Sequence, residues 1–196
     1  KAKMLGKVLK VKIFNIAKIV KDIEIKKLNK EEYRILEEYL SQIEHNDSTN
    51  REGHSAKIYF SALFGNNFSR NKENSLNAFL NYGYQLLLSA FNKEIVANGY
   101  LTQIGIFHKN MFNYYNLSSD LMEPFRVIVD ELAYKENPQK FEKDEKRKLQ
   151  NILNLKFRIN NVNHYLSDVI KIYTKSIFDA LSSNDLSLVR FFQDEL

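Results

Sequence analysis

The sequence contains no cysteine, and only 2 of its 196 residues are proline and 6 are glycine. Without cysteine there are no disulfides, no thiolate zinc sites and no cysteine nucleophile, so any bound metal must use His, Asp or Glu. The scarcity of helix-breaking residues favours long helices. No apolar run approaches the roughly 18 residues of a membrane span, and no signal-peptide pattern is present. We therefore expect no membrane association and a cytoplasmic location.

The sequence also lacks an internal repeat and a glycine-rich phosphate-binding loop, which argues against hydrolysis of nucleoside triphosphates. What is present is an ordinary globular composition, with 44% hydrophobic and 27% charged residues. Because 196 residues is close to the usual size of one domain, residues 1–196 are expected to form a single domain.

The net charge of +5 is concentrated near the beginning of the chain. Residues 1–28 contain nine lysines against Asp22 and Glu24, so this stretch carries +7 and the other residues together carry −2. The apolar residues of positions 4–25 recur at helical spacing and predict an amphipathic helix. Two interpretations of its lysines remain open: a surface that binds nucleic-acid phosphates, an anionic membrane or a partner, and a solvated helix face.

Hydrophobic periodicity over the rest of the chain predicts an all-α fold, a single helical domain of about seven helices with at most one small β-hairpin. The hairpin is expected within residues 156–166, where paired asparagines tolerate the left-handed positions of a tight turn. The helices after the first are expected over residues 29–44, 50–64, 75–98, 117–134, 137–155 and 166–181.

Local signals set several helix ends. Gly65 and Gly99 are expected to end the helices that precede them, and Asn137 with Pro138 to begin a new helix as its cap and first residue. Gly83 lies inside a predicted helix, where glycine costs roughly 1 kcal/mol relative to alanine. That cost predicts close packing against a neighbouring backbone.

One histidine and two carboxylates in the middle of the chain suggest a metal site. His108 ends an apolar run, and Asp120 and Glu123 follow three residues apart in the next predicted helix, so both carboxylates lie on one face. Pro124 should bend that helix beside them. A loop of about a dozen residues can return His108 over the acids, which gives half of a site for Mn²⁺ or Mg²⁺. Asp120 is either an auxiliary ligand or a support for the other ligands.

A further ligand must come from elsewhere, and Glu52 in the segment REGHSAKIYF is the best candidate. Thr49 and Glu52 also fit a capping box, in which the glutamate hydrogen-bonds to the backbone and does no chemistry. Both interpretations stay open from the residues alone. His54 is two positions further along the helix, so it faces away from Glu52 and is at most a supporting residue or a DNA contact.

Three ordered blocks, REGHSAKIYF, NAFLNYGYQLLLSAF and GIFHKNMFNYYNLSSDLMEPFR, resemble the signature of the CRISPR adaptation integrase (Cas-one) family, most closely its type II-A branch. The resemblance covers about residues 16–181 and favours Glu52 as a ligand. It implies a C-terminal catalytic helical domain, and the N-terminal β-sheet domain of the family is absent from this chain. The first residue is not methionine, which agrees with a longer protein. We expect the fragment to fold alone and keep the metal site but to integrate poorly.

The resemblance implies a catalytic and metal-binding set of Glu52, His108 and Glu123, with Asp120 as auxiliary residue. The implied activity is that of a divalent-metal-dependent DNA integrase or endonuclease, which joins spacer 3′-hydroxyl ends to the CRISPR repeat by transesterification. The cofactor is Mn²⁺ or Mg²⁺; the mixed nitrogen and oxygen donors favour Mn²⁺. The implied partners are double-stranded DNA (prespacer and repeat), the Cas-two protein and, in the full-length protein, a second copy.

Phosphate contacts are expected from cationic side chains around this site. Among them Arg126 is the strongest candidate because it lies beside Glu123, although an ion pair with that acid is the alternative. Two other functions remain open, a metal-dependent nuclease that uses water and a non-catalytic nucleic-acid-binding assembly module. The predicted DNA-binding residues are Arg51, His54, Arg70, Lys109 and Arg126.

Overall fold

The computed structural model describes residues 31–42, 51–159 and 161–192, and it confirms an all-α fold with one small hairpin. The predicted basic helix of residues 4–25 and the loop of residues 45–50 lie outside the described residues. The elements are α2 (Glu31–Ser41), α3 (Arg51–Phe64), α4 (Ser75–Ala97), α5 (Asn116–Met122), the 3₁₀ turn η2 (Glu123–Phe125), α6 (Arg126–Glu136), α7 (Lys143–Gln150), η3 (Asn151–Asn154), strands β1 (Lys156–Ile159) and β2 (Val162–Tyr165), α8 (Leu166–Ser183) and η4 (Leu186–Leu188).

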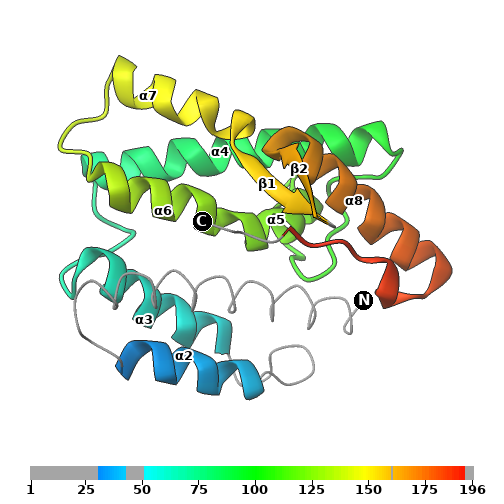
Figure 1. Ribbon diagram of the computed structural model, residues 1–196, viewed down its shortest axis with the longest axis horizontal. Coiled ribbons are helices and arrows are strands. Elements are labelled where there is room, and N and C mark those ends of the chain that lie inside the picture. Colours follow the sequence, from blue (N-terminus) through cyan, green and yellow to red (C-terminus); the bar gives the residue numbers. More distant parts are fainter. Residues whose placement is uncertain (1–30, 43–50, 160, 193–196) are drawn as a thin grey trace.

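Helix α4 is the centre of the fold, and α5, α6, α7 and α8 pack against it (Figure 1). The helix begins where the Asn74 side chain accepts a hydrogen bond from the Asn77 backbone N–H at 2.8 Å. Gly99 follows its end with a φ of 79°, as predicted for a glycine that ends a helix. Its buried face supplies much of the core, including Phe79, Leu80, Leu87, Phe91 and Ile95, all fully buried.

Gly83 lies where α4 meets α6 and α7. A Cβ atom at this position would lie 3.1 Å from Leu149 Cδ2 and closer still to Val129 Cγ1. The close packing expected from the sequence is therefore present, but side chains and not a neighbouring backbone make the contact.

The break predicted at Pro124 is real. The chain changes from α5 to the 3₁₀ turn η2 at Glu123 and continues as α6 from Arg126. Proline lacks the backbone N–H that would continue the α-helical ladder, and a 3₁₀ turn tolerates its loss. As a result, Asp120 and Glu123 belong to different elements and not to one continuous helix.

The start of α7 was predicted wrongly. Asn137 has a φ of 41° and ends α6 as its C-cap, with its N–H bonded to Ala133 O. The next helix begins after Glu142, which forms a capping box with Glu145. Asparagine suits both helix starts and left-handed helix ends, so the sequence alone did not separate the two roles.

Strands β1 and β2 form the predicted hairpin, with Phe157 opposite His164 and Ile159 opposite Val162. Asn161 at the turn has a φ of 64°, the left-handed conformation that the paired asparagines suggested. Helix α8 begins directly after β2 and returns across α4.

Helices α2 and α3 pack on each other and form a pair beside the remaining helices (Figure 1). Gly65, with a φ of 87°, ends α3 as expected and starts the connection to α4. Within the described part of the chain, no helix has the length and hydrophobicity needed to cross a membrane.

Candidate metal site

The segment between α4 and α5 carries His108 and folds as a loop tied back to the start of α5. Leu117 N donates to Thr102 O at 2.8 Å, and the Thr102 hydroxyl donates to Tyr114 O at 2.7 Å. The Asn116 side chain donates to the carbonyls of Gln103 and Asn110. These bonds close the loop at its base and bring its middle over α5.

Asp120 on α5 fixes the middle of this loop. Its carboxylate accepts hydrogen bonds from three successive backbone N–H groups, those of Ile106 (2.5 Å), Phe107 (2.9 Å) and His108 (3.2 Å). Asp120 is 6% exposed, so these bonds satisfy a buried charge. The loop approaches so closely that a Cβ atom on Gly105 would lie 2.8 Å from Asp120 Oδ2.

Asp120 also orients the His108 ring. His108 Nδ1 lies 2.5 Å from Asp120 Oδ1, so the carboxylate holds the ring proton on Nδ1 and leaves the Nε2 lone pair available. The hydrogen bond to Asp120 raises the pKa of His108, and partial burial opposes this rise. A carboxylate behind a histidine in this way fixes the tautomer and increases the basicity of a metal ligand.

Glu123 lies beside this pair and is 7% exposed. Its Oε1 is 3.2 Å from Nη2 of Arg126. The charge of Glu123 raises the pKa of His108 and the charge of Arg126 lowers it, so both charges act on the imidazole. The sequence left two roles open for Arg126, an ion pair with Glu123 and a contact with DNA phosphate. The structure contains the ion pair, and the phosphate contact stays a prediction.

The donor set fits a divalent cation in part. His108 Nε2 and the Glu123 carboxylate are the nitrogen and oxygen donors that Mn²⁺ accepts. Among the side chains that the structure describes, no group of three His, Asp or Glu is arranged to hold a metal. The side chain of Glu52 is not among the described side chains, and only its place in the first turn of α3 is known. Its role as ligand or capping residue stays a prediction.

Three of the predicted DNA-binding residues lie in two places: Arg51 and His54 at the start of α3, and Lys109 in the loop beside His108. Lys109 is exposed and lines a cavity of about 330 Å³ together with His108. At the start of α3, the Arg51 guanidinium lies 4.9 Å from the centre of the Tyr39 ring, and the exposed His54 ring lies 6.2 Å from the same ring. These placements leave Lys109 and His54 accessible to a ligand.

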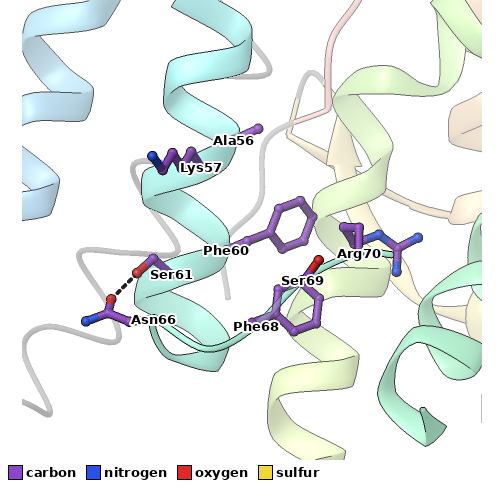
Figure 2. A pocket seen from close by; sticks show the side chains of 8 residues that line it. All are labelled: Ala56, Lys57, Phe60, Ser61, Asn66, Phe68, Ser69 and Arg70. Atoms are coloured by element: carbon purple, nitrogen blue, oxygen red, sulfur yellow. Dashed lines mark hydrogen bonds between the residues drawn. The ribbon is translucent and has the colours of Figure 1, made fainter. Parts of the chain in front are cut away.

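Arg70 is held by protein groups in the connection between α3 and α4. Its guanidinium donates to Asn77 Oδ1 at 2.6 Å and to Asn81 Oδ1 at 2.5 Å. It also borders a cavity of about 560 Å³ between this connection and α3, where the Phe60 and Phe68 rings lie 5.5 Å apart (Figure 2). Arg70 therefore has a structural role, and its predicted contact with DNA stays a prediction.

The sequence reasoning missed a buried acid, Asp130. It is 2% exposed, Tyr59 donates to its Oδ2 at 3.0 Å, and Tyr84 donates to its Oδ1. A signal was available, because Asp130 follows the apolar run Val127–Val129 at a position where α6 is expected to be buried.

Comparison with known proteins gives a consistent result. Residues 1–165 match the family model described as CRISPR associated protein Cas1. The CRISPR-associated endonuclease Cas1 of Neisseria meningitidis serogroup C is 41% identical over 90 residues, a match that covers 46% of this chain and 30% of that protein. The chain therefore spans about 30% of the length of this curated relative.

Solved structures share the fold over nearly the whole chain. A casposase bound to its integration product has a TM-score of 0.75 at 21% identity, over 96% of this chain and 62% of that one. A partial Cas6-RT-Cas1–Cas2 complex has a TM-score of 0.77 at 16% identity, over 100% of this chain and 70% of that one. At these identities the likeness establishes the fold alone.

Proposed function

The chain belongs to the CRISPR-associated Cas1 family, and from that premise we propose that it forms the metal-binding, DNA-joining part of a CRISPR adaptation integrase. One observation carries the proposal. His108 has its Nδ1 engaged by a buried carboxylate and its Nε2 available, and the buried Glu123 acts on the same ring. This arrangement is typical of a supported metal ligand.

In the proposed site, His108, Glu123 and Glu52 would hold Mn²⁺ or Mg²⁺. A cation held there would supply polarisation of a phosphodiester and stabilisation of the charge on the oxygens that attack and leave. Asp120 keeps the His108 proton on Nδ1 and holds the loop in place. Arg126 offsets the charge of Glu123 before DNA and metal arrive.

The proposed reaction is transesterification. A spacer 3′-hydroxyl attacks a phosphodiester of the CRISPR repeat, a new phosphorus–oxygen bond forms, and the old bond breaks to release a 3′-hydroxyl. One phosphodiester replaces another, so no nucleoside triphosphate is needed. The casposase bound to an integration product and the complex containing Cas1 and Cas2 support DNA and Cas2 as partners. Assembly as a homodimer is part of the proposal.

Product analysis with the whole protein and Cas2 tests this function. A labelled prespacer and a repeat-containing DNA are expected to give a branched joined product in Mn²⁺. His108→Ala and Glu123→Gln should reduce joining by about a hundredfold or more, because each removes a donor to the metal. His164→Ala, on strand β2, is the matched control and should leave joining unchanged.

The same assay separates the two alternatives. A nuclease that uses water would give cut DNA without a joined product, and a prespacer ending in a 3′-deoxynucleotide would not stop it. A non-catalytic assembly module would leave joining unaffected by His108→Ala and Glu52→Gln. Either result would contradict the proposed function.

A further inference from the structure

A buried carboxylate joins the helix that carries Glu52 to the helix that follows Glu123. Tyr59 on α3 donates to Asp130 on α6 across 71 positions of sequence, and Tyr84 on α4 donates to the other oxygen. Tyr59 is 1% exposed and Asp130 is 2% exposed. Since α3 packs chiefly on α2 among the described elements, this bond is a specific connection between the two groups of helices.

Two arginines lie against this cluster, and the charge of Glu131 on α6 also acts on Tyr59. The guanidinium carbons of Arg70, before α4, and Arg126, on α6, each lie 5.3 Å from the centre of the Tyr84 ring. Both cations favour the ionised form of Asp130, and burial opposes it. The arginine that pairs with Glu123 thus packs against the tyrosine that holds Asp130.

The spacing along the two helices connects this cluster to the site. Position 52 precedes Tyr59 by seven positions within α3, which is close to two turns at about 3.6 residues per turn, so the two positions lie on one side of that helix. Glu123 also precedes Asp130 by seven positions, but it lies in η2, the 3₁₀ turn directly before α6 begins at Arg126. Helices α3 and α6 run in the same direction (Figure 1). A bond between positions 59 and 130 therefore brings the first turn of α3 to the same end of the pair as η2, where Glu123 lies.

We propose that the Tyr59–Asp130–Tyr84 cluster sets the register of α3 on α6 and so positions Glu52 opposite Glu123, which makes Asp130 and Tyr59 positioning residues for the metal site. The inference rests on the proposed function, because only there is Glu52 a metal ligand. Tyr59 acts through helix α3 and touches neither the metal nor the DNA.

The test is a double-mutant cycle between Tyr59→Phe and Glu52→Gln, with Mn²⁺ affinity measured by calorimetry in the folded protein. Tyr59→Phe removes one hydroxyl and keeps the ring. We expect it to weaken Mn²⁺ binding about tenfold, as loss of a supporting partner does at metal sites. Glu52→Gln should weaken binding at least as much, and the double variant no more than Glu52→Gln alone, because both changes act through the same ligand.

Tyr82→Phe is the matched control. Tyr82 is a half-buried tyrosine of α4 whose hydroxyl accepts a hydrogen bond from the Gln150 side chain on α7 at 3.2 Å, so the change also removes one hydroxyl and its bond and should leave Mn²⁺ affinity unchanged. If Tyr59→Phe does not fold, Asp130→Asn replaces it in the cycle. This variant keeps the shape of the side chain and should also couple to Glu52→Gln.

The outcomes separate this inference from the function on which it rests. If Glu52→Gln weakens binding and Tyr59→Phe does not, or if their effects add, the inference is overturned and the proposed function stands. If Glu52→Gln has no effect, the proposed ligand set and the inference both fail. A purely structural role for Tyr59 would lower the unfolding midpoint and leave the Mn²⁺ affinity unchanged.

Discussion

The carboxylate of Asp120 has two structural roles, and the sequence pattern alone does not show either of them. It accepts three backbone N–H groups of the loop and it holds His108 Nδ1. The sequence predicted that His108, Asp120 and Glu123 lie in one region because a short polar loop joins them. It left the role of Asp120 open, because the backbone groups that the carboxylate meets depend on the path of an irregular loop.

The Asp120→Asn variant should lower the pKa of His108. The hydrogen bond to the Asp120 carboxylate is the main cause of the raised value, and a neutral amide stabilises the imidazolium less. An NMR titration of the histidine ring protons measures this change. Asp179→Asn, on the exposed side of α8 beside Lys175, is the control and should leave His108 unaffected. An unchanged His108 pKa in Asp120→Asn would contradict the assigned pairing.

At the scale of helices, periodicity and glycine predicted most boundaries. Gly65 and Gly99 end α3 and α4 in the left-handed conformation that glycine adopts without strain. The error at Asn137 has a local cause, since asparagine also adopts that conformation and so ends α6 where a cap for the next helix was expected. Long helices with repeated apolar positions were predictable, whereas their short connections depended on which turn each asparagine takes.

Gly83→Ala tests the packing between α4, α6 and α7. Alanine favours a helix over glycine by about 1 kcal/mol, but its Cβ would overlap Val129 and crowd Leu149. Overpacking costs about 1 to 3 kcal/mol, so after the gain in helix propensity we expect a net loss of up to about 2 kcal/mol in the free energy of unfolding. Urea denaturation measures it. Ser89→Ala, exposed on the same helix, should be neutral or stabilising, and a stabilised Gly83→Ala would refute the close contact.

The Asp130 cluster should make stability depend on pH. Burial raises the pKa of Asp130 to about 6, while the hydroxyls of Tyr84 and Tyr59 and the charges of Arg126 and Arg70 limit the rise. Between about pH 4 and about pH 6 the folded state keeps a proton that the unfolded state has lost. The contribution of this group is therefore present at low pH and is lost as the pH rises through about 6.

Asp130→Asn removes that proton. The unfolding free energy of the parent relative to this variant should fall by about 2 to 3 kcal/mol between pH 4 and pH 7, at about 1.4 kcal/mol per unit. Urea denaturation at a series of pH values measures the difference. Asp179→Asn should show no such trend, since that carboxylate is exposed. A difference that stays constant with pH would show that Asp130 ionises in the folded state as it does in the unfolded chain.

For the whole molecule, the sequence identified the family because three separated blocks occur in the right order, and the family model confirms that identification. The type II-A subdivision stays a prediction. The arrangement of α2 and α3 against the other helices was not predictable, because the contacts that make it, among them the bonds of Tyr59 and Tyr84 to Asp130, join residues far apart in the sequence. Buried polar bonds of this kind leave only a weak trace in a hydrophobic pattern.

The proposed site draws on distant parts of the chain: the loop with His108, the turn with Glu123 and the start of α3 with Glu52. The three proposed donors therefore come from three separate elements of the chain. Function at this scale depends on the correct packing of the two helix groups, which is the reason that positioning residues in the core are expected to affect metal binding.

Calorimetric titration with Mn²⁺ tests the central claim most directly, with the parent compared with His108→Ala, Glu123→Gln and the control His164→Ala. The parent and His164→Ala are expected to bind a single Mn²⁺. The other two variants should lose binding, with unchanged circular dichroism to show that the fold survives. Binding that persists in His108→Ala and Glu123→Gln, or is absent from the parent, would contradict the metal site.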